Sequence, residues 1–440
     1  DLIQKRAQWR AILPHVVANR LAKKALSNIP PGTLMATFEA EGNHRLLMSF
    51  AHRIGSMHDH PVAQMIVEAW LQPDGLLGQI STLEINSLRI LEYIAPVAPQ
   101  TLLDRIENEI GNPNFPDMWT NNTTCRTPIL NLLKYLAYDT DAFDRCLKLL
   151  IVVADHEDEK NKVDEIHEII SNFFKPILSG THATLSQRLE VLEACLGSDQ
   201  AEHRFLGIKL LSSSLSNGPY MTWGNNEFGA RPRDFGYQPN SAEIFKWRCD
   251  FIDVAVRLAT SEDQDLKGQA RVMLANKFRG MWKQEIIQEK LIAAATQINN
   301  NQQWIEGWKV IVEIISSYSD TSNGESNSCI LPQGLTDLEE KLKPRDLVAK
   351  IKTYVLSDHS STLMLCLDSS QIDASRFSNA DNILAEKASK LGSQFAVSDH
   401  DLDELGPKLF ATDYMPHRIN FGSGFAKGSS ELRNSWQRLI

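Results

Sequence analysis

Apolar residues recur along most of this chain at the spacing that places them on one face of an α-helix. The segment 184–197 is typical, because Leu185, Leu189, Leu192 and Leu196 fall on one side of the helix that it predicts. Similar segments follow one another nearly from end to end, and we expect about 18 to 20 helices joined mostly by short connections. The pattern predicts an all-α protein.

Many of these segments begin with a short polar residue that is followed three positions later by Glu or Gln. Such a pair can form a capping box, in which each side chain accepts a hydrogen bond from the backbone amide of the other residue at the first turn of a helix. The pairs are Ser81 with Glu84, Thr184 with Gln187, Asn240 with Glu243, Ser261 with Gln264, and Thr336 with Glu339. Each pair predicts a helix start.

Neighbouring helical segments form pairs at about the spacing of HEAT-like units. Residues 127–139 pair with 141–153, and residues 184–197 pair with 199–215. We therefore expect an irregular α-solenoid of HEAT- or TPR-like hairpins rather than a closed bundle. Residues 7–13 alternate in part between apolar and polar side chains, which predicts a short edge strand near the N-terminus.

Polar segments interrupt the array at 111–126, 216–240, 318–334 and 357–379. Loops of this length within a compact array are functional or mobile. We expect a first helical array over residues 31–317 with 216–240 as an inserted loop, a linker at 318–334, and a second array over 335–440 that continues beyond the fragment. The lack of an initiator Met and a last segment that reads as mid-helix indicate a piece of a longer polypeptide.

Composition narrows the classes of function. The 440 residues are 42% hydrophobic and carry a net charge of −10, so the chain as a whole lacks the positive field that drives non-specific binding to nucleic acid. Its six cysteines are scattered without a C-x-x-C pair, which suits a reducing cytoplasm and argues against disulfides and zinc. No apolar run approaches the roughly 20 residues that span a bilayer.

The inserted loop is the strongest candidate for a binding site. Within residues 225–239 two arginines stand among three aromatic residues, and arginine can pair with carboxylate or phosphate while aromatic rings stack or fill a partner's pocket. The candidate residues are Phe228, Arg231, Arg233, Phe235 and Tyr237. A structural role is the favoured alternative: the arginines would cap helix ends and pair with Asp234 or Glu227, and the rings would hold the loop against the helices.

Histidines supply two further candidates. His15 follows Pro14 at an expected helix start, where free amides and the helix dipole attract an anion such as a phosphate, although a first-turn histidine is more often a surface or capping residue. A second group lies between residues 44 and 60, next to Asp59. Its members are His44, His52, His58 and His60. Their spacing does not specify a compact ligand set, so we expect no metal site.

Two other segments resemble sites only in composition. Residues 422–429 contain Lys427 before Gly428 and Ser429, whereas a phosphate-binding P-loop places the glycine before the lysine and the hydroxyl directly after it. The acidic segments 155–168 and 399–404 are expected to solvate helix starts. We therefore expect no catalytic residue and no cofactor in the 440 residues of this chain.

Six strings resemble one group of large bacterial proteins, the signal-transducing STAND-type P-loop ATPases related to the Avs antiphage sensors. They span nearly the whole chain in order, and the strings at 178–196 and 227–239 are the most specific. They are WRAILPHVVANRLAKKALSNIP (9–30), LLMSFAHRIGSMHDHPVAQMIVEAWLQPDGLLG (46–78), YIAPVAP (93–99), LSGTHATLSQRLEVLEACL (178–196), EFGARPRDFGYQP (227–239) and FGSGFAKGSSELRNSWQRL (421–439).

The resemblance implies that residues 1–30 are the tail of a winged-helix region and that the remainder belongs to the helical sensor. The ATPase core, with its ATP or ADP and Mg, and an effector would lie upstream in a cytoplasmic bacterial protein. In such ATPases a histidine at the start of a winged-helix helix contacts the β-phosphate of ADP, and His15 matches that position. The triplet Met57-His58-Asp59 is the competing candidate for this contact. The implied partners are a protein ligand such as a phage structural or packaging protein, the protein's own ATPase domain, and further copies on activation.

The leading hypothesis is therefore a non-catalytic helical-repeat sensor that controls an upstream ATPase and effector. One alternative is a HEAT-like scaffold that binds nucleic acid through the basic N-terminal segment and the loop containing Arg231 and Arg233. Another is an all-helical hydrolase that uses the histidine-rich residues 44–60.

Overall fold

The computed structural model describes residues 3–6, 9–12, 15–115, 123–218, 228–320, 332–356, 380–398, 405, 409 and 417–429. These residues form 19 α-helices, two short 3-10 helices and one pair of strands. The chain divides into two compact units, Asp1–Ile244 and Phe245–Ile440. Each unit is an array of helices, so the expected all-α helical-repeat fold is confirmed.

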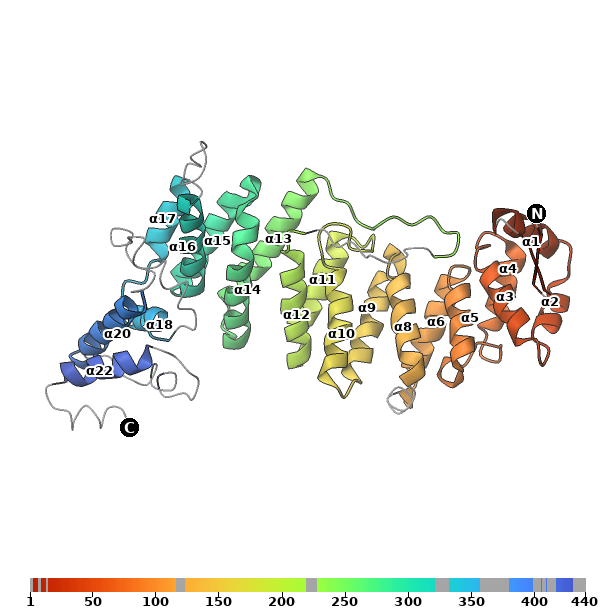
Figure 1. Ribbon diagram of the computed structural model, residues 1–440, viewed down its shortest axis with the longest axis horizontal. Coiled ribbons are helices and arrows are strands. Elements are labelled where there is room, and N and C mark those ends of the chain that lie inside the picture. Colours follow the sequence, from red (N-terminus) through yellow and green to blue (C-terminus); the bar gives the residue numbers. More distant parts are fainter. Residues whose placement is uncertain are drawn as a thin grey trace. The chain divides into compact units, whose positions relative to one another are not determined.

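The first unit contains the helices from α1 to α12 (Figure 1). They are α1 (His15–Leu26), α2 (Pro31–Phe38), α3 (His44–Ile54), α4 (Pro61–Trp70), α5 (Ile85–Ile94), α6 (Pro99–Ile110), α8 (Thr123–Leu136), α9 (Thr140–Asp155), α10 (Lys160–Asn172), α11 (Leu185–Leu196) and α12 (Ala201–Ser214), with the 3-10 helix η1 (Ile80–Thr82). The pairs expected at 127–139 with 141–153 and at 184–197 with 199–215 are present as α8 with α9 and α11 with α12.

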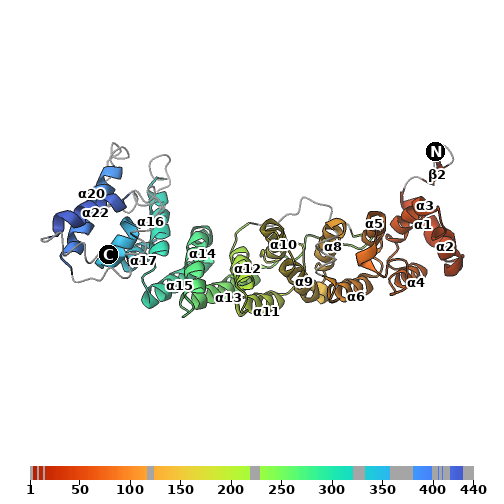
Figure 2. The same cartoon turned by 90° about the horizontal axis from the view of Figure 1, so that it is seen from below.

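The helices of the first unit stack in chain order as two layers, which Figure 2 shows as two rows. Helices α3, α5 and α8 contact one another in turn within one layer, and α6 contacts α9 in the other. Contacts between α8 and α9 and between α11 and α12 join the layers. Helices close in sequence are thus neighbours in space, as in a solenoid.

Apolar side chains between the two layers form the core of the first unit. In α9 the apolar stripe includes Phe143, Leu147 and Leu150, all fully buried. Leu133 of α8 and Leu103 of α6 are also fully buried. Burial of these apolar side chains is the main source of stability for the packed helices, and it contributes about 25 cal/mol of free energy per Å² of apolar surface removed from water.

A β-hairpin precedes α1. Strand β1 (Ile3–Arg6) pairs with β2 (Trp9–Ile12) in antiparallel register, with Ile3 opposite Ile12 and Arg6 opposite Trp9. The strand expected within residues 7–13 is therefore present, and the structure adds the partner strand that the sequence pattern did not indicate.

Helix α13 (Ser241–Ala259) begins at the end of the first unit and continues into the second. The remaining helices of the second unit are α14 (Gln264–Trp282), α15 (Gln288–Asn301), α16 (Ile305–Asp320), α17 (Gln333–Leu342), α18 (Leu347–Tyr354), α20 (Ala380–Ala396) and α22 (Arg418–Gly428), with the 3-10 helix η2 (Glu285–Ile287). Their core is rich in aromatic rings, including the fully buried Trp304 and the ring of Phe278 beside it.

The glycine-rich string at 422–429 is helix α22 rather than a phosphate loop. A Cβ atom at Gly424 would collide with the backbone of Ser389 in α20, and one at Gly428 would collide with Ser393. Ser393 also donates a hydrogen bond to the carbonyl oxygen of Gly424, 2.8 Å away. These glycines therefore allow two helix backbones to approach closely, which accounts for the composition of the string.

The expected capping boxes have mixed outcomes. The box of Thr184 with Gln187 is complete at the start of α11, and that of Asn240 with Glu243 forms before α13. Asp263 caps α14 instead of Ser261, since its carboxylate accepts from two first-turn amides. Thr336 lies inside α17, and Ser81 belongs to η1. These last three predictions were wrong.

The two units meet at residues 244 and 245, shortly after the 216–240 loop. The segment expected as the linker, 318–334, lies largely outside the described residues, so this boundary and the arrays assigned on either side of it stay predictions. Among the described helices, none is both long and apolar enough to cross a membrane.

Candidate functional site

Residues 228–237, here called the strap, are the described C-terminal part of the 216–240 loop. In Figure 1 the green trace before α13 runs along one end of the helices of the first unit. Its contacts fall on the turns that follow α3, α5 and α8, and on the connection between α10 and α11. The strap therefore joins helix pairs that are distant in sequence.

The first part of the strap is fixed after α5. Nε of Arg231 donates a hydrogen bond to the carbonyl oxygen of Pro96 at 2.5 Å. Gly229 has a φ of +59°, and a Cβ atom there would collide with the carbonyl oxygen of Gly55 and the ring of Pro96. Only glycine fits this close approach to two helix ends without strain.

Arg233 holds the strap against the end of α8. Its Nη1 donates to the carbonyl oxygen of Tyr135 at 2.8 Å, and its Nη2 lies 3.3 Å from a carboxylate oxygen of Asp139. The guanidinium carbon lies 3.9 Å from the ring centre of Phe228 and 4.3 Å from that of Tyr138. Burial lowers the pKa of Arg233, while Asp139 opposes this shift. A cation at the carbonyl end of α8 is also favoured by the helix dipole.

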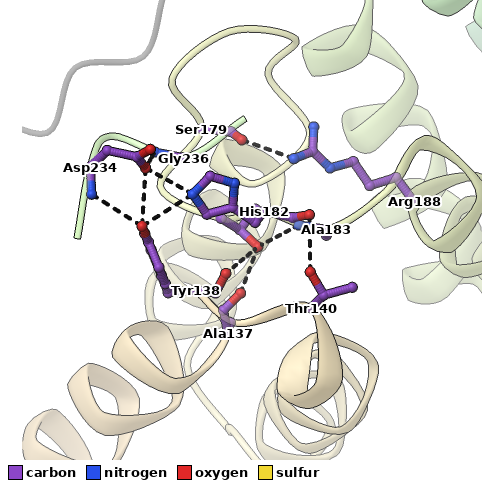
Figure 3. Close-up of polar contacts among 10 residues, drawn as sticks. Ala137, Tyr138, Thr140, Ser179, His182, Ala183, Arg188, Asp234 and Gly236 are labelled. Carbon is purple, nitrogen blue, oxygen red and sulfur yellow. Dashed lines mark hydrogen bonds and ion pairs between the residues drawn. The ribbon is translucent and has the colours of Figure 1, made fainter. Parts of the chain in front are cut away.

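Three side chains fasten the middle of the strap (Figure 3). One carboxylate oxygen of Asp234 lies 2.8 Å from Nε2 of His182 and accepts from the hydroxyl of Tyr138 at 3.0 Å. It also accepts from the amide of Gly236 at 2.8 Å. Burial by itself would raise the pKa of Asp234, but these hydrogen bonds outweigh it and lower the pKa. We call this cluster the latch.

Backbone hydrogen bonds hold the end of the strap beside residues 178–182. The amides of Leu178 and Gly180 donate to the carbonyl oxygens of Tyr237 and Phe235, each at 3.0 Å, and the amide of Tyr237 donates to Thr181 at 2.9 Å. The fully buried Arg188 lies beside this junction, donating to the hydroxyl of Ser179 at 3.0 Å (Figure 3). Burial lowers its pKa to about 9.

Next to the strap lies an open groove of about 520 Å³. Four helices and the strap line it: α1, α3, α5 and α8 with residues 228 and 229. Its polar and aromatic wall includes Asn19, Arg53, Glu92, Tyr93, Asn131 and Tyr135. The volume falls within the range typical of ligand sites, about 300 to 1,000 Å³.

Charges of both signs line this groove without forming an ion pair with each other. Nη1 of Arg53 donates to Oδ1 of Asn19 at 2.6 Å. Loss of water raises the pKa of Glu92, an effect that Arg89 partly offsets. In the described part of the chain, no hydrogen bond or ion pair of the Glu92 carboxylate is found. The groove thus combines a half-buried acid, a positioned guanidinium and aromatic rings.

Two of the five predicted binding residues have buried side chains, whereas Arg231 and Tyr237 are partly exposed and Phe235 is exposed. Phe228 is 4% exposed and the Arg233 side chain is 4% exposed, whereas Phe235 is 46% exposed. Arg231 and Arg233 cap helix ends, as in the structural alternative, with Asp139 rather than Asp234 as the acidic partner. Tyr237 lies under Arg188, whose guanidinium is 5.3 Å from its ring centre. A contact of these residues with a partner stays a prediction.

Helix α1 begins at His15, as expected, but the His15 side chain lies outside the described residues, so the nucleotide-sensing hypothesis stays a prediction. Within the histidine group, Nδ1 of His60 accepts from the amide of Val62 and caps α4. His52 packs edge-on against Tyr93 at 4.8 Å. Burial and the nearby Arg231 lower the pKa of His58. These contacts are structural.

Sequence reasoning missed a cluster with the composition of a catalytic triad. Nε2 of His203 lies 2.9 Å from a carboxylate oxygen of Asp155, and its Nδ1 lies 3.1 Å from the hydroxyl of Ser198. The Ser198 hydroxyl also accepts from the amide of Gln200, just before α12. Because Asp155 ends α9 and the Ser198 oxygen accepts a backbone hydrogen bond at the start of α12, the cluster joins these two helices.

Comparison with known proteins adds no relative: no protein-family model, curated protein or solved structure matches the chain.

Proposed function

We propose that this chain is a non-catalytic, helical-repeat sensor segment of a bacterial STAND-type ATPase of antiphage defence. It binds a protein ligand and thereby controls an ATPase and an effector elsewhere in the parent protein. The observation that carries the proposal is the groove beside the strap, on an array of stacked helix pairs. Such arrays present extended surfaces for macromolecular partners.

The sequence resemblance supports the same reading. The two most specific strings, 178–196 and 227–239, contain the residues that meet at the latch, His182 and Asp234. A strap joined to several helix pairs can transmit ligand binding as a shift in helix packing, provided that the ligand has different affinities for the two packings. Nucleotide and Mg would bind elsewhere in the parent protein, with activation by oligomerisation.

The alternative, a scaffold that grips nucleic acid through the loop arginines, has less support. Both Arg231 and Arg233 donate to backbone carbonyl oxygens, and Arg233 is also stacked between rings. The Nε donor of Arg231 and both terminal nitrogens of Arg233 are therefore engaged within the protein. A nucleic-acid complex would show affinity that falls steeply with salt.

Binding of the 440-residue chain to a panel of purified phage structural and packaging proteins tests the proposal. Biolayer interferometry should find a ligand, and Asn131→Trp, which fills the groove from the exposed face of α8, should weaken its binding at least tenfold. The exposed variant Glu68→Trp on α4 is the matched control. The proposal is wrong if none of these proteins binds while duplex DNA or RNA binds with a steep salt dependence.

A further inference from the structure

We propose that the groove between α3, α5, α8 and the strap binds a peptide segment of the protein ligand through a lysine or arginine side chain that pairs with Glu92. This inference rests on the proposed function, because it specifies the chemistry by which a protein ligand is recognised. It assigns a recognition role to a residue that the sequence pattern did not distinguish from other acids on helix surfaces.

Glu92 is a partly buried acid in the wall of the groove. Its carboxylate lines the groove and is partly removed from water, but within the described residues it has neither a hydrogen bond nor an ion pair. A partly desolvated charge without a partner is unfavourable, and a cation placed beside it recovers that free energy. A cationic group of a ligand should therefore bind favourably beside the Glu92 carboxylate.

The remaining wall of the groove suits a peptide. Asn131 and Ser56 line the same groove and can donate and accept hydrogen bonds with peptide amides. Tyr93 and Tyr135 add aromatic rings, against which an ammonium or guanidinium group gains further attraction. The groove is open to solvent along one side, as an extended chain segment requires.

The surroundings already accept arginine side chains from the same protein. The strap places Arg231 on the carbonyl oxygen of Pro96 and Arg233 on that of Tyr135, and both of these acceptor residues line the groove. Arg53 in the groove wall and Arg231 in the strap are each hydrogen-bonded to an oxygen of the protein. Arg89 acts on Glu92 only through its charge, so within the described residues an incoming cation finds the Glu92 carboxylate without a hydrogen bond or ion pair.

The test uses the 440-residue chain and two fluorescein-labelled nonapeptides of glycine and serine that differ only at the central residue, arginine or glutamate. Fluorescence anisotropy should show binding of the arginine peptide and at least tenfold weaker binding of the glutamate peptide. Glu92→Gln should weaken binding of the arginine peptide about tenfold, which is the scale of one charge pair. Glu84→Gln, at the exposed start of the same helix, is the matched control and should leave binding unchanged.

Glu92→Lys adds a second readout, because it should reverse the preference toward the glutamate peptide. The inference is overturned if the arginine peptide does not bind the wild-type chain, if both peptides bind equally, or if Glu92→Gln and Glu84→Gln act alike. A phage protein that binds wild type and Glu92→Gln with equal affinity would overturn this inference alone. If the arginine peptide binds at Glu92 but no protein of the panel binds, the cation site is supported and the proposed function is wrong.

Discussion

The guanidinium carbon of Arg233 lies 3.9 Å from the ring centre of Phe228, so two residues of one loop form a stacked pair over the end of α8. The same guanidinium donates to the carbonyl oxygen of Tyr135. Although its sequence predicts a binding segment, the strap holds helix ends of the first unit together. Arg233 makes several of these contacts, so replacing this one residue tests the role of the strap.

Arg233→Ala should destabilise the first unit by about 2 to 3 kcal/mol, since it removes charge-assisted hydrogen bonds and the contact with two rings. Urea unfolding measures the change. Hydrogen exchange should also accelerate at the amides of Leu178, Gly180 and Tyr237, which bond across the strap. The exposed Arg89→Ala on α5 is the control and should change stability by less than about 0.5 kcal/mol. Unaltered exchange in Arg233→Ala would contradict the bracing role.

Because of the latch, the free energy of unfolding should depend on pH in the acidic range. The folded pKa of Asp234 lies below its usual value, so its stabilising contribution is complete above about pH 4 and is lost as the pH falls through the folded pKa. Asp234→Asn should therefore be less stable than wild type near neutral pH, and the difference should shrink below about pH 4. Thermal unfolding from pH 3 to pH 7 measures it.

The exposed Asp158→Asn is the control for that series and should follow the wild-type pH profile. A constant gap between Asp234→Asn and wild type across the whole range would show that the carboxylate charge does not stabilise the latch.

Gly229→Ala should loosen the strap, because the backbone there has a φ of +59° and a Cβ atom would collide with Gly55 and Pro96. We expect a loss of about 2 kcal/mol or more. Gly32→Ala in α2 is the matched control, since a Cβ atom there meets no neighbouring atom within 4 Å, and it should be neutral or slightly stabilising. Equal stability of the two variants would argue against the close approach.

Arg126 joins α8 to the segment after α9. Its Nε lies 2.6 Å from a carboxylate oxygen of Glu157, whose side chain is 5% exposed, and its Nη1 lies 2.8 Å from Glu165. Arg126→Ala should cost about 3 kcal/mol in urea unfolding, because Glu157 keeps a buried charge without its guanidinium partner. The acidic segment 155–168 thus does more than solvate a helix start.

Arg145, whose side chain is 31% exposed and pairs with the more exposed Asp104 and Glu107, provides the comparison for Arg126. Arg145→Ala should cost about 1 kcal/mol or less, as surface ion pairs do. If the two variants lost equal stability, burial of the Arg126 pair would not be the cause.

Local signals explain which sequence predictions succeeded. A stripe such as Leu185 to Leu196 requires only the geometry of one helix, and the capping box of Thr184 with Gln187 closes within four residues. Ser261 failed because Asp263, two positions later, offers a competing cap, and the sequence does not rank the two. The glycines of α22 were visible as composition, but their reason is a neighbouring helix, which the string itself does not contain.

The sequence by itself determined the helical repeats, because apolar periodicity and caps act over a few residues and leave a local record. The tertiary structure alone decided where residues 228–237 of the 216–240 loop lie. Arg231 meets Pro96 and Arg233 meets Tyr135 across 135 and 98 positions. The partners of a buried cation depend on which helix ends, with their free carbonyl groups, the packing of whole helices brings together. The same packing forms the groove at Glu92.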